Sequence, residues 1–253
     1  MNRQVNRLTR NAFKLALAAP LALALAACGD DTGDIDNGDV IEPVAAPEGS
    51  NWTETVTVSE QDGYVLGNPD APLKLVEYAS HTCGACANFA MTGKPGIEEY
   101  VATGIVSFEQ RNLVRDPIDL AIATLVRCGA KENMQVLSDQ AWGNLEGTFQ
   151  AVNQNGAAYE AAGQLPVEQR FIAIAEAAGL IDFFAARGLS ADQQRACLAD
   201  TEVIERIAEN SSSQADELGI NSTPTFLLNG RVLDARSWSD LEPILQRAGA
   251  RQE

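Results

Sequence analysis

Basic residues are scarce in this chain. Its 253 residues include 18 lysines and arginines against 35 aspartates and glutamates, which gives a formal net charge of −17. A chain of this charge repels phosphate groups, so nucleic acid and anionic lipid headgroups are excluded as expected partners.

Histidine is scarcer still, because His81 is the only one. The five cysteines include one pair at Cys-x-x-Cys spacing, Cys83 and Cys86. A zinc site would need a second such pair or two histidines. The sequence therefore predicts neither a metal site nor a bound cofactor, and this pair is either redox-active or a static local disulfide.

The N-terminal apolar run, Leu15–Ala27, is shorter than the roughly 20 residues that span a bilayer. It follows four basic residues, which is the layout of an export signal. The run ends in Leu-Ala-Ala-Cys28, which resembles the lipobox of bacterial lipoproteins, where the signal is cut before a cysteine that then carries a lipid. The resemblance implies a signal peptide over residues 1–27 and lipidation of Cys28. The alternative is an ordinary secretory signal with Cys28 incidental, and both place the mature protein outside the cytoplasm.

Residues 28–52 lack basic side chains and contain seven acidic ones and two prolines. A segment of this composition cannot bury a core. We expect a flexible acidic tether here, with an acidic recognition tail as the alternative. The remaining residues, 53–253, have the length of one globular domain.

Strand patterns occur in two separate parts of this domain. Leu73–Tyr78 predicts a buried strand, Ala87–Val101 a helix broken near Gly93, and Ile105–Phe108 a second strand. From Pro117 to Leu218 strand patterns are almost absent, and recurring Gly and Pro residues divide the stretch into several helices. The last of these helices is expected to begin at a cap on Thr201 and to stop at Gly219.

Strand structure returns near the C-terminus. Thr225–Leu228 and Arg231–Leu233 flank Asn229-Gly230, a strong hairpin signal. A closing helix is expected after a capping box at Ser239–Glu242, with Trp238, Leu241, Leu245 and Ala248 on one face. The order resembles an α/β thioredoxin-like fold with a large α-helical insertion, about residues 117–205, between its βαβ and ββα parts.

The pair Cys83 and Cys86 stands where a strand passes into a helix. A helix N-terminus offers unpaired N–H groups, which favour a thiolate and lower a cysteine pKa from about 8.5 to roughly 3.5–7.5. Cys86 lies one turn inside the helix and is expected to be shielded. The first sulfur would exchange with a disulfide and the second would resolve the mixed disulfide.

Glu77, the Cys83-x-x-Cys86 motif and Thr223-Pro224 before a strand together resemble the DsbA family of bacterial disulfide oxidoreductases, over roughly residues 60–250. The resemblance implies that Pro224 is a cis-proline facing the cysteines and that the backbone of Thr223 binds an extended substrate chain. It also implies that Glu77 moves a proton to or from Cys86. A solvated Glu77 at a sheet edge is the alternative.

One feature departs from the family. The best-known oxidases have a histidine between the two cysteines, whereas this chain has Gly84-Ala85. His81, two residues before Cys83, is expected to bind substrate or to have a structural role. The departure leaves the redox direction open.

Cys128 and Cys197 lie near the two ends of the helical stretch. A bond between them would close a loop of about 70 residues and stabilise the fold by roughly 4 kcal/mol. We expect a structural disulfide. A second redox pair that relays electrons to Cys83 and Cys86 is the alternative.

These features predict a periplasm-facing thiol–disulfide oxidoreductase of the bacterial envelope, held to a membrane by a lipid on Cys28. Its substrates would be exported proteins in which it forms or exchanges disulfides, and a membrane redox partner would reset it. The alternatives are a reductase of envelope thiols with the same fold and a peptide-binding chaperone module with a static disulfide.

Overall fold

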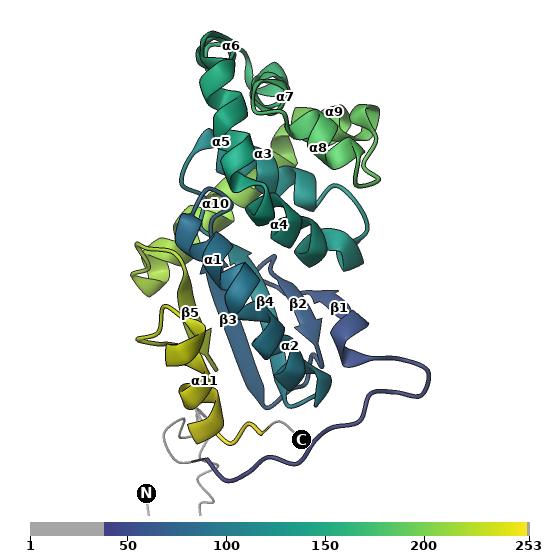
Figure 1. The fold of residues 1–253 in the computed structure, drawn as a ribbon, viewed down its shortest axis with the longest axis vertical. Coiled ribbons are helices and arrows are strands. Elements are labelled where there is room, and N and C mark those ends of the chain that lie inside the picture. Colours follow the sequence, from purple (N-terminus) through teal and green to yellow (C-terminus); the bar gives the residue numbers. More distant parts are fainter. Residues whose placement is uncertain (1–37, 252–253) are drawn as a thin grey trace, which may run out of the picture. The chain divides into compact units, whose positions relative to one another are not determined.

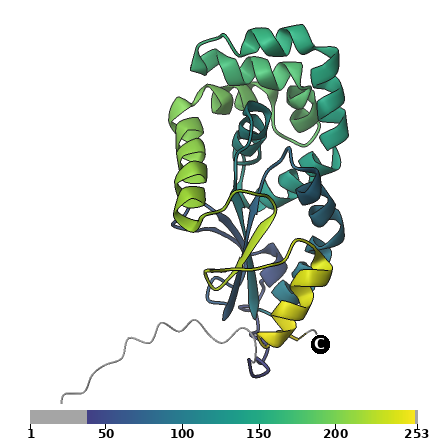
Figure 2. The same ribbon diagram turned by 90° about the vertical axis from the view of Figure 1, so that its left-hand side faces the viewer.

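The computed structural model describes residues 38–251, and their centre is a six-stranded sheet of order β1-β2-β4-β3-β5-β6 (Figures 1 and 2). Strands β3 and β4 are parallel, and the other neighbours are antiparallel. The strands are β1 (Val56–Val58), β2 (Tyr64–Gly67), β3 (Leu73–Ala79), β4 (Val106–Asn112), β5 (Thr225–Leu228) and β6 (Arg231–Val232).

Helices cover both faces of the sheet (Figure 2). On one face lie α1 (Gly84–Thr92), α2 (Lys94–Ala102) and α11 (Trp238–Arg247), and α10 (Thr201–Leu218) lies on the other. The alternation of β3 explains the division, because Val76 and Tyr78 pack with the α10 side while Leu75 joins the core beneath α2 and α11. Glu77 therefore points to the face that carries α1.

The helical block follows β4, in the place that the sequence predicts. Its helices α5 to α9 gather beyond α3 and α4, away from the sheet (Figure 1). Helix α10 begins at Thr201, and Ala215 near its C-terminal end packs with Val76 and Tyr78 of β3. The block comprises α3 (Pro117–Val126), α4 (Met134–Gly143), α5 (Leu145–Gln154), α6 (Gly156–Ala162), α7 (Val167–Ala177), α8 (Leu180–Ala185) and α9 (Ala191–Ala199).

The turns confirm two sequence signals and correct two others. Asn229 and Gly230 have φ of 49° and 81°, as the hairpin requires, and Gly219 ends α10 with φ of 66°. Asp200, rather than Thr201, caps α10 through its side chain. The capping box predicted at Ser239–Glu242 is wrong, because α11 begins two residues earlier.

Ser237 and Asp240 form the observed capping box of α11. The Ser237 hydroxyl donates to the Asp240 carboxylate at 2.6 Å, and that carboxylate accepts the backbone N–H of Ser237 at 3.0 Å. The predicted apolar face is present, since Leu241, Leu245 and Ala248 are buried.

Residues 38–51 correct the expectation of a free tether up to residue 52. They have no helix or strand, as expected, but three backbone N–H groups bind the ends of other elements. Gly38, Ile41 and Val44 donate to the carbonyls of Arg247, Gly249 and Thr103 at 2.9–3.0 Å. The composition did not show this docking because it uses backbone groups.

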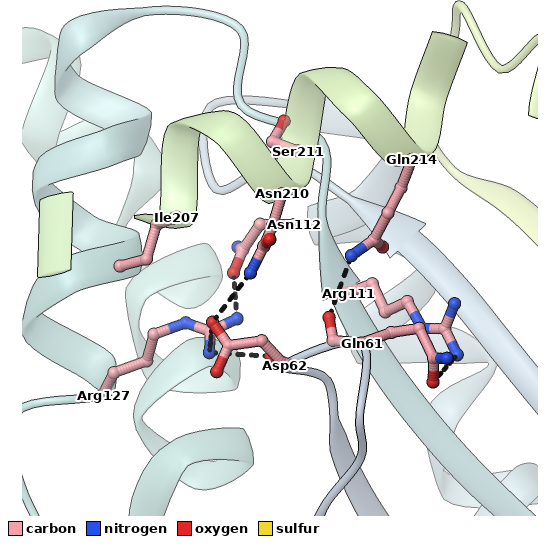
Figure 3. A pocket seen from close by; sticks show the side chains of 9 residues that line it. All are labelled: Gln61, Asp62, Arg111, Asn112, Arg127, Ile207, Asn210, Ser211 and Gln214. Atoms are coloured by element: carbon pink, nitrogen blue, oxygen red, sulfur yellow. Dashed lines mark hydrogen bonds and ion pairs between the residues drawn. The ribbon is translucent and has the colours of Figure 1, made fainter. Parts of the chain in front are cut away.

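A polar junction joins the β1–β2 turn to helices α3 and α10 (Figure 3). Asp62 binds Arg206 of α10 at 2.6 Å and pairs with Arg127 at 3.5 Å. Arg127 also donates to the backbone carbonyl of Asp62 and to Asn112. The junction fixes α10, which leads into the loop that faces the cysteines.

Between residues 38 and 251, no helix combines the length and the apolar character needed to cross a membrane.

Candidate active site

Cys83 lies at the N-cap of α1, directly after the turn that follows β3. Its sulfur accepts the backbone N–H of Cys86 at 3.3 Å. Cys83 is 4% exposed beside the exposed Gly84 and Ala85, whereas Cys86 has no exposed surface. Both cysteines are free thiols in this structure. Both cysteines are therefore buried, but Cys83 keeps a small exposed fraction beside the exposed Gly84-Ala85 dipeptide whereas Cys86 is fully enclosed.

The loop after α10 brings Thr223 and Pro224 against this pair. The peptide bond between them is cis, the conformation that the family resemblance implies. The Cys83 thiol donates to the carbonyl oxygen of Thr223 at 3.4 Å. A chain joined to Cys83 through its own sulfur would therefore lie beside the backbone of Thr223.

The two sulfurs have opposite acidities. The pKa of Cys83 is lowered to about 5, first by the hydrogen bond from the Cys86 thiol and then by the side chain of Thr223 and the backbone N–H groups of Cys86 and Ala85, while burial opposes the shift. The pKa of Cys86 is raised by its hydrogen bond to Cys83, by burial and by the charge of Glu77. At neutral pH the first sulfur is a thiolate and the second keeps its proton.

Glu77 is buried in β3, which removes the alternative of a solvated edge carboxylate. Glu77 is 3% exposed, and its Oε1 has no hydrogen-bond partner among the described residues. Burial raises the pKa of Glu77 to about 8, with Lys94 opposing the shift and the charges of Asp139 and Cys83 adding to it. Glu77 is therefore neutral at pH 7 and able to give up a proton close to that pH.

Lys94 and Asp139 are site residues that the sequence analysis missed. Lys94 is 4% exposed at the start of α2, and its Nζ contacts Asp139 of α4 at 2.5 Å. Burial raises the pKa of Asp139, and Lys94 opposes the shift. The sequence contained one signal of this pair, a lysine at the predicted break of the helix. It could not identify Asp139 as the partner, because Asp139 lies 45 positions later in the chain.

His81 does not reach the substrate side, so that half of its expected role is wrong and the structural half remains. His81 is 0% exposed, and its ring is stacked on Trp142 with ring centroids 5.0 Å apart. The ring Nε2 lies 3.0 Å from the hydroxyl of Ser138, and Nδ1 lies 3.5 Å from Asp119.

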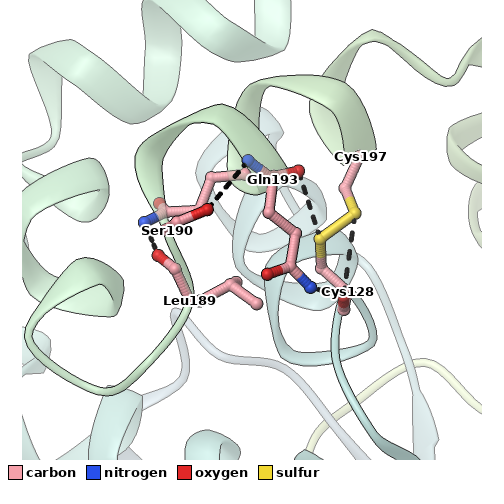
Figure 4. The surroundings of a disulfide bond; sticks show 6 residues. Cys128, Leu189, Ser190, Gln193 and Cys197 are labelled. Atoms are coloured by element: carbon pink, nitrogen blue, oxygen red, sulfur yellow. Dashed lines mark hydrogen bonds between the residues drawn. A yellow bond between two sulfur atoms is a disulfide. The ribbon is translucent and has the colours of Figure 1, made fainter.

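Cys128 and Cys197 form a disulfide that joins the end of α3 to α9 (Figure 4). Their Cα atoms are 5.9 Å apart, and the bond spans 69 positions. The pair lies within the helical block, apart from the Cys83 site. Cys28, the expected lipidation site, and the expected signal peptide over residues 1–27 lie outside the described residues.

Together these groups can exchange a disulfide without any bound group. The N-capping sulfur of Cys83 serves as nucleophile and leaving group, and the buried sulfur of Cys86 resolves the mixed disulfide. The buried carboxyl group of Glu77 holds a proton. The loop that contains cis-bonded Pro224 packs against Cys83 through the carbonyl of Thr223.

Comparison with known proteins agrees with this chemistry. The thioredoxin family model matches residues 59–247. A Rickettsia bellii protein provisionally named protein-disulfide oxidoreductase is 23% identical over 203 residues, which are 80% of this chain and 70% of that protein. A similarly named Rickettsia typhi protein is 23% identical over 75% of this chain, which spans 63% of the relative's length.

Two solved structures resemble the fold closely. A protein-disulfide isomerase from Novosphingobium aromaticivorans superposes with a TM-score of 0.68 and 28% identity, covering 73% of this chain and 96% of that one. Wolbachia pipientis α-DsbA1 gives a TM-score of 0.60 at 20% identity, covering 76% and 93%. The chain belongs to the thioredoxin family, and it is a thiol–disulfide oxidoreductase with a DsbA-like fold.

Proposed function

We propose that this protein oxidises or rearranges cysteine pairs in exported proteins, with Cys83 as the sulfur that meets the substrate. The observation that carries the proposal is the sulfur of Cys83 at the start of α1, 3.3 Å from the N–H of Cys86. A pKa of Cys83 near 5 favours its thiolate, which stabilises the reduced pair and makes the oxidised pair a strong oxidant.

The reaction begins with an oxidised Cys83–Cys86 disulfide. A substrate thiolate attacks the sulfur of Cys83, and the bond to Cys86 breaks as the new mixed disulfide forms. Cys86 departs as a thiolate and takes up a proton, because its high pKa favours the thiol. We propose that Glu77, which is neutral at pH 7, supplies that proton, and the effect of its charge on the Cys86 thiol supports this role.

A second substrate thiolate then attacks the substrate sulfur of the mixed disulfide. Cys83 leaves as a thiolate, which its low pKa makes a good leaving group. Two substrate thiols have become a disulfide and the cysteine pair is reduced. During these steps the substrate backbone would lie along Thr223, next to the cis-bonded Pro224.

The reduced pair needs an external oxidant, and we propose a membrane redox partner for this step. The sequence of residues 1–28 supports an envelope location, with Cys28 carrying a lipid. The Cys128–Cys197 disulfide is consistent with an oxidising compartment. Mass spectrometry of the mature N-terminus in membranes tests the anchor: a lipid on Cys28 supports it, and an unmodified N-terminus contradicts it.

Redox equilibration decides the direction. The full chain is equilibrated with glutathione buffers, and the reduced fraction of Cys83 and Cys86 is measured by alkylation and peptide mass spectrometry. We expect a potential toward the oxidising end, near about −120 mV. A potential near about −270 mV would indicate a reductase, and a pair that stays oxidised throughout would make the motif structural.

A further inference from the structure

The turn before Cys83 is held by two helices of the insertion. The carbonyl oxygen of Ser80 accepts the ring N–H of Trp142, on α4, at 2.9 Å. The backbone N–H of His81 donates to the carboxylate of Asp119, on α3, at 2.8 Å. Thus both polar atoms of the peptide group between Ser80 and His81, which leads into the redox motif, are bound to the helical block.

The side chain of His81 strengthens this attachment. Its ring Nδ1 faces Asp119 Oδ1 at 3.5 Å, and Nε2 lies 3.0 Å from the Ser138 hydroxyl. That contact is too long to count as a hydrogen bond, and Nδ1 has no hydrogen-bond partner among the described residues. Stacking on Trp142 fixes the plane of the ring. The His81 side chain thus contacts Asp119, Ser138 and Trp142, which all belong to helices of the insertion.

The position of this turn decides where the reactive sulfur lies. The N–H of Cys83 donates to the carbonyl of Ser80 at 3.2 Å, and its sulfur accepts from Cys86 at 3.3 Å. Hydrogen bonds weaken steeply as their alignment is lost. A small rotation of the turn would therefore take the sulfur away from the N–H group that stabilises its charge.

We infer that His81 is a positioning residue for the redox pair, which couples the helical insertion to the charge on the Cys83 sulfur. The inference rests on the proposed role of Cys83 as the substrate-facing thiolate. His81 does not touch the reacting sulfurs in this role. It acts through the backbone of Ser80 and Cys83.

The test is the variant His81→Leu, made in the full chain. The alkylation rate of Cys83 is followed against pH, and the pair is equilibrated with glutathione. We expect the midpoint to rise by about one pH unit and the equilibrium constant for oxidising glutathione to fall about tenfold, which is about 30 mV for two electrons. A folded His81→Leu protein with the wild-type midpoint would overturn the inference.

Two further variants separate positioning from loss of stability. His81→Asn keeps a polar side chain that faces Asp119 and is expected to restore most of the wild-type midpoint. Gln194→Leu removes another fully buried polar side chain, which binds the carbonyls of Ile181 and Leu189. It is expected to destabilise the block without moving the midpoint, and an equal shift in this control would overturn the inference.

If His81→Leu does not fold, Ser138→Ala carries the test. It removes the hydroxyl that His81 Nε2 and Gln110 Nε2 both contact, and it is expected to shift the midpoint in the same direction. An unchanged midpoint in that variant would overturn the inference. The wild-type curve tests the proposed function separately. A wild-type midpoint near about 8.5 would refute the thiolate role of Cys83 itself, whereas failure of the inference leaves the low wild-type midpoint in place.

Discussion

The two cysteine pairs of this protein differ in what surrounds their sulfurs. The Cys83 sulfur receives the backbone N–H of Cys86, at the positive end of α1. The sulfurs of Cys128 and Cys197 instead lie 3.4 Å and 3.9 Å from the carbonyl oxygens of Gln193 and Cys128 (Figure 4). N–H groups stabilise a thiolate and carbonyl oxygens do not. The Cys83 sulfur also lies 3.4 Å from the carbonyl oxygen of Thr223, so the N–H groups at the start of α1, and not a lack of carbonyl neighbours, distinguish the reactive sulfur.

The pairs also differ in their separation along the chain. Cys83 and Cys86 lie within one turn, so their bond can form and break while the fold stays intact. The bond between Cys128 and Cys197 spans 69 positions and restricts the unfolded chain. One pair is therefore suited to redox cycling and the other to stability.

The largest effect is expected from Cys83→Ser. Loss of the nucleophile should reduce oxidation of a model dithiol peptide to the uncatalysed background, because Cys86 is buried and keeps its proton. The matched control is Cys128→Ala with Cys197→Ala, which should retain catalysis below its melting temperature. Catalysis that survives Cys83→Ser would break the comparison and favour a binding module.

Glu77→Gln should change the pH dependence of stability. The folded state binds the Glu77 proton more tightly, with a pKa of about 8 against an ordinary 4.5. The stability it confers is complete below pH 4.5 and is lost as the pH rises through 8, by roughly 4–5 kcal/mol. Denaturant unfolding from pH 4 to 9 is measured on the protein with Cys83 and Cys86 oxidised, because a reduced Cys83 with its lowered pKa would gain stability over the same range. It should show this loss in the wild type and a flatter profile in the variant. The exposed Glu99→Gln serves as control, and a wild-type profile in Glu77→Gln would contradict the account.

Removing the second pair should cost stability alone. Cys128→Ala with Cys197→Ala is expected to lower the free energy of unfolding by about 4 kcal/mol, measured by denaturant titration. The redox potential of Cys83 and Cys86 should stay the same. A shifted potential would mean that the two pairs communicate, as a relay would require.

The smallest effect is expected at the cap of α11. Ser237→Ala removes a capping hydroxyl and should lower the free energy of unfolding by about 1 kcal/mol. Ser239→Ala, two residues later, should have a smaller effect, and neither should alter the acidity of Cys83. Equal losses in both variants would show that the capping box is placed wrongly.

The redox motif and its supports were predictable because each depends on local pattern. A Cys-x-x-Cys between a strand and a helix places one sulfur at an N-cap, and the apolar run around Glu77 already indicated a buried carboxyl group. The Asn229-Gly230 hairpin and the stop at Gly219 follow from the need for positive φ.

What could not be predicted depends on packing between distant segments. Lys94 and Asp139 each have the pattern of an ordinary helix-surface charge, and only the approach of α2 to α4 buries them together. The position of His81, two residues before Cys83, suggested a place near the substrate. Only the folded structure shows that Trp142 and Ser138 enclose its ring. Residues 38–51 dock through backbone groups, which composition does not reveal.

The acidity of Cys83 tests the central claim most directly. The pH dependence of thiolate absorbance, or of alkylation at Cys83, would be measured in the reduced full chain. The account predicts a midpoint near pH 5, and Cys86 should remain protonated throughout. A midpoint near about 8.5, the ordinary value for a cysteine, would contradict it, because the N-terminus of α1 would then confer no reactivity on the pair.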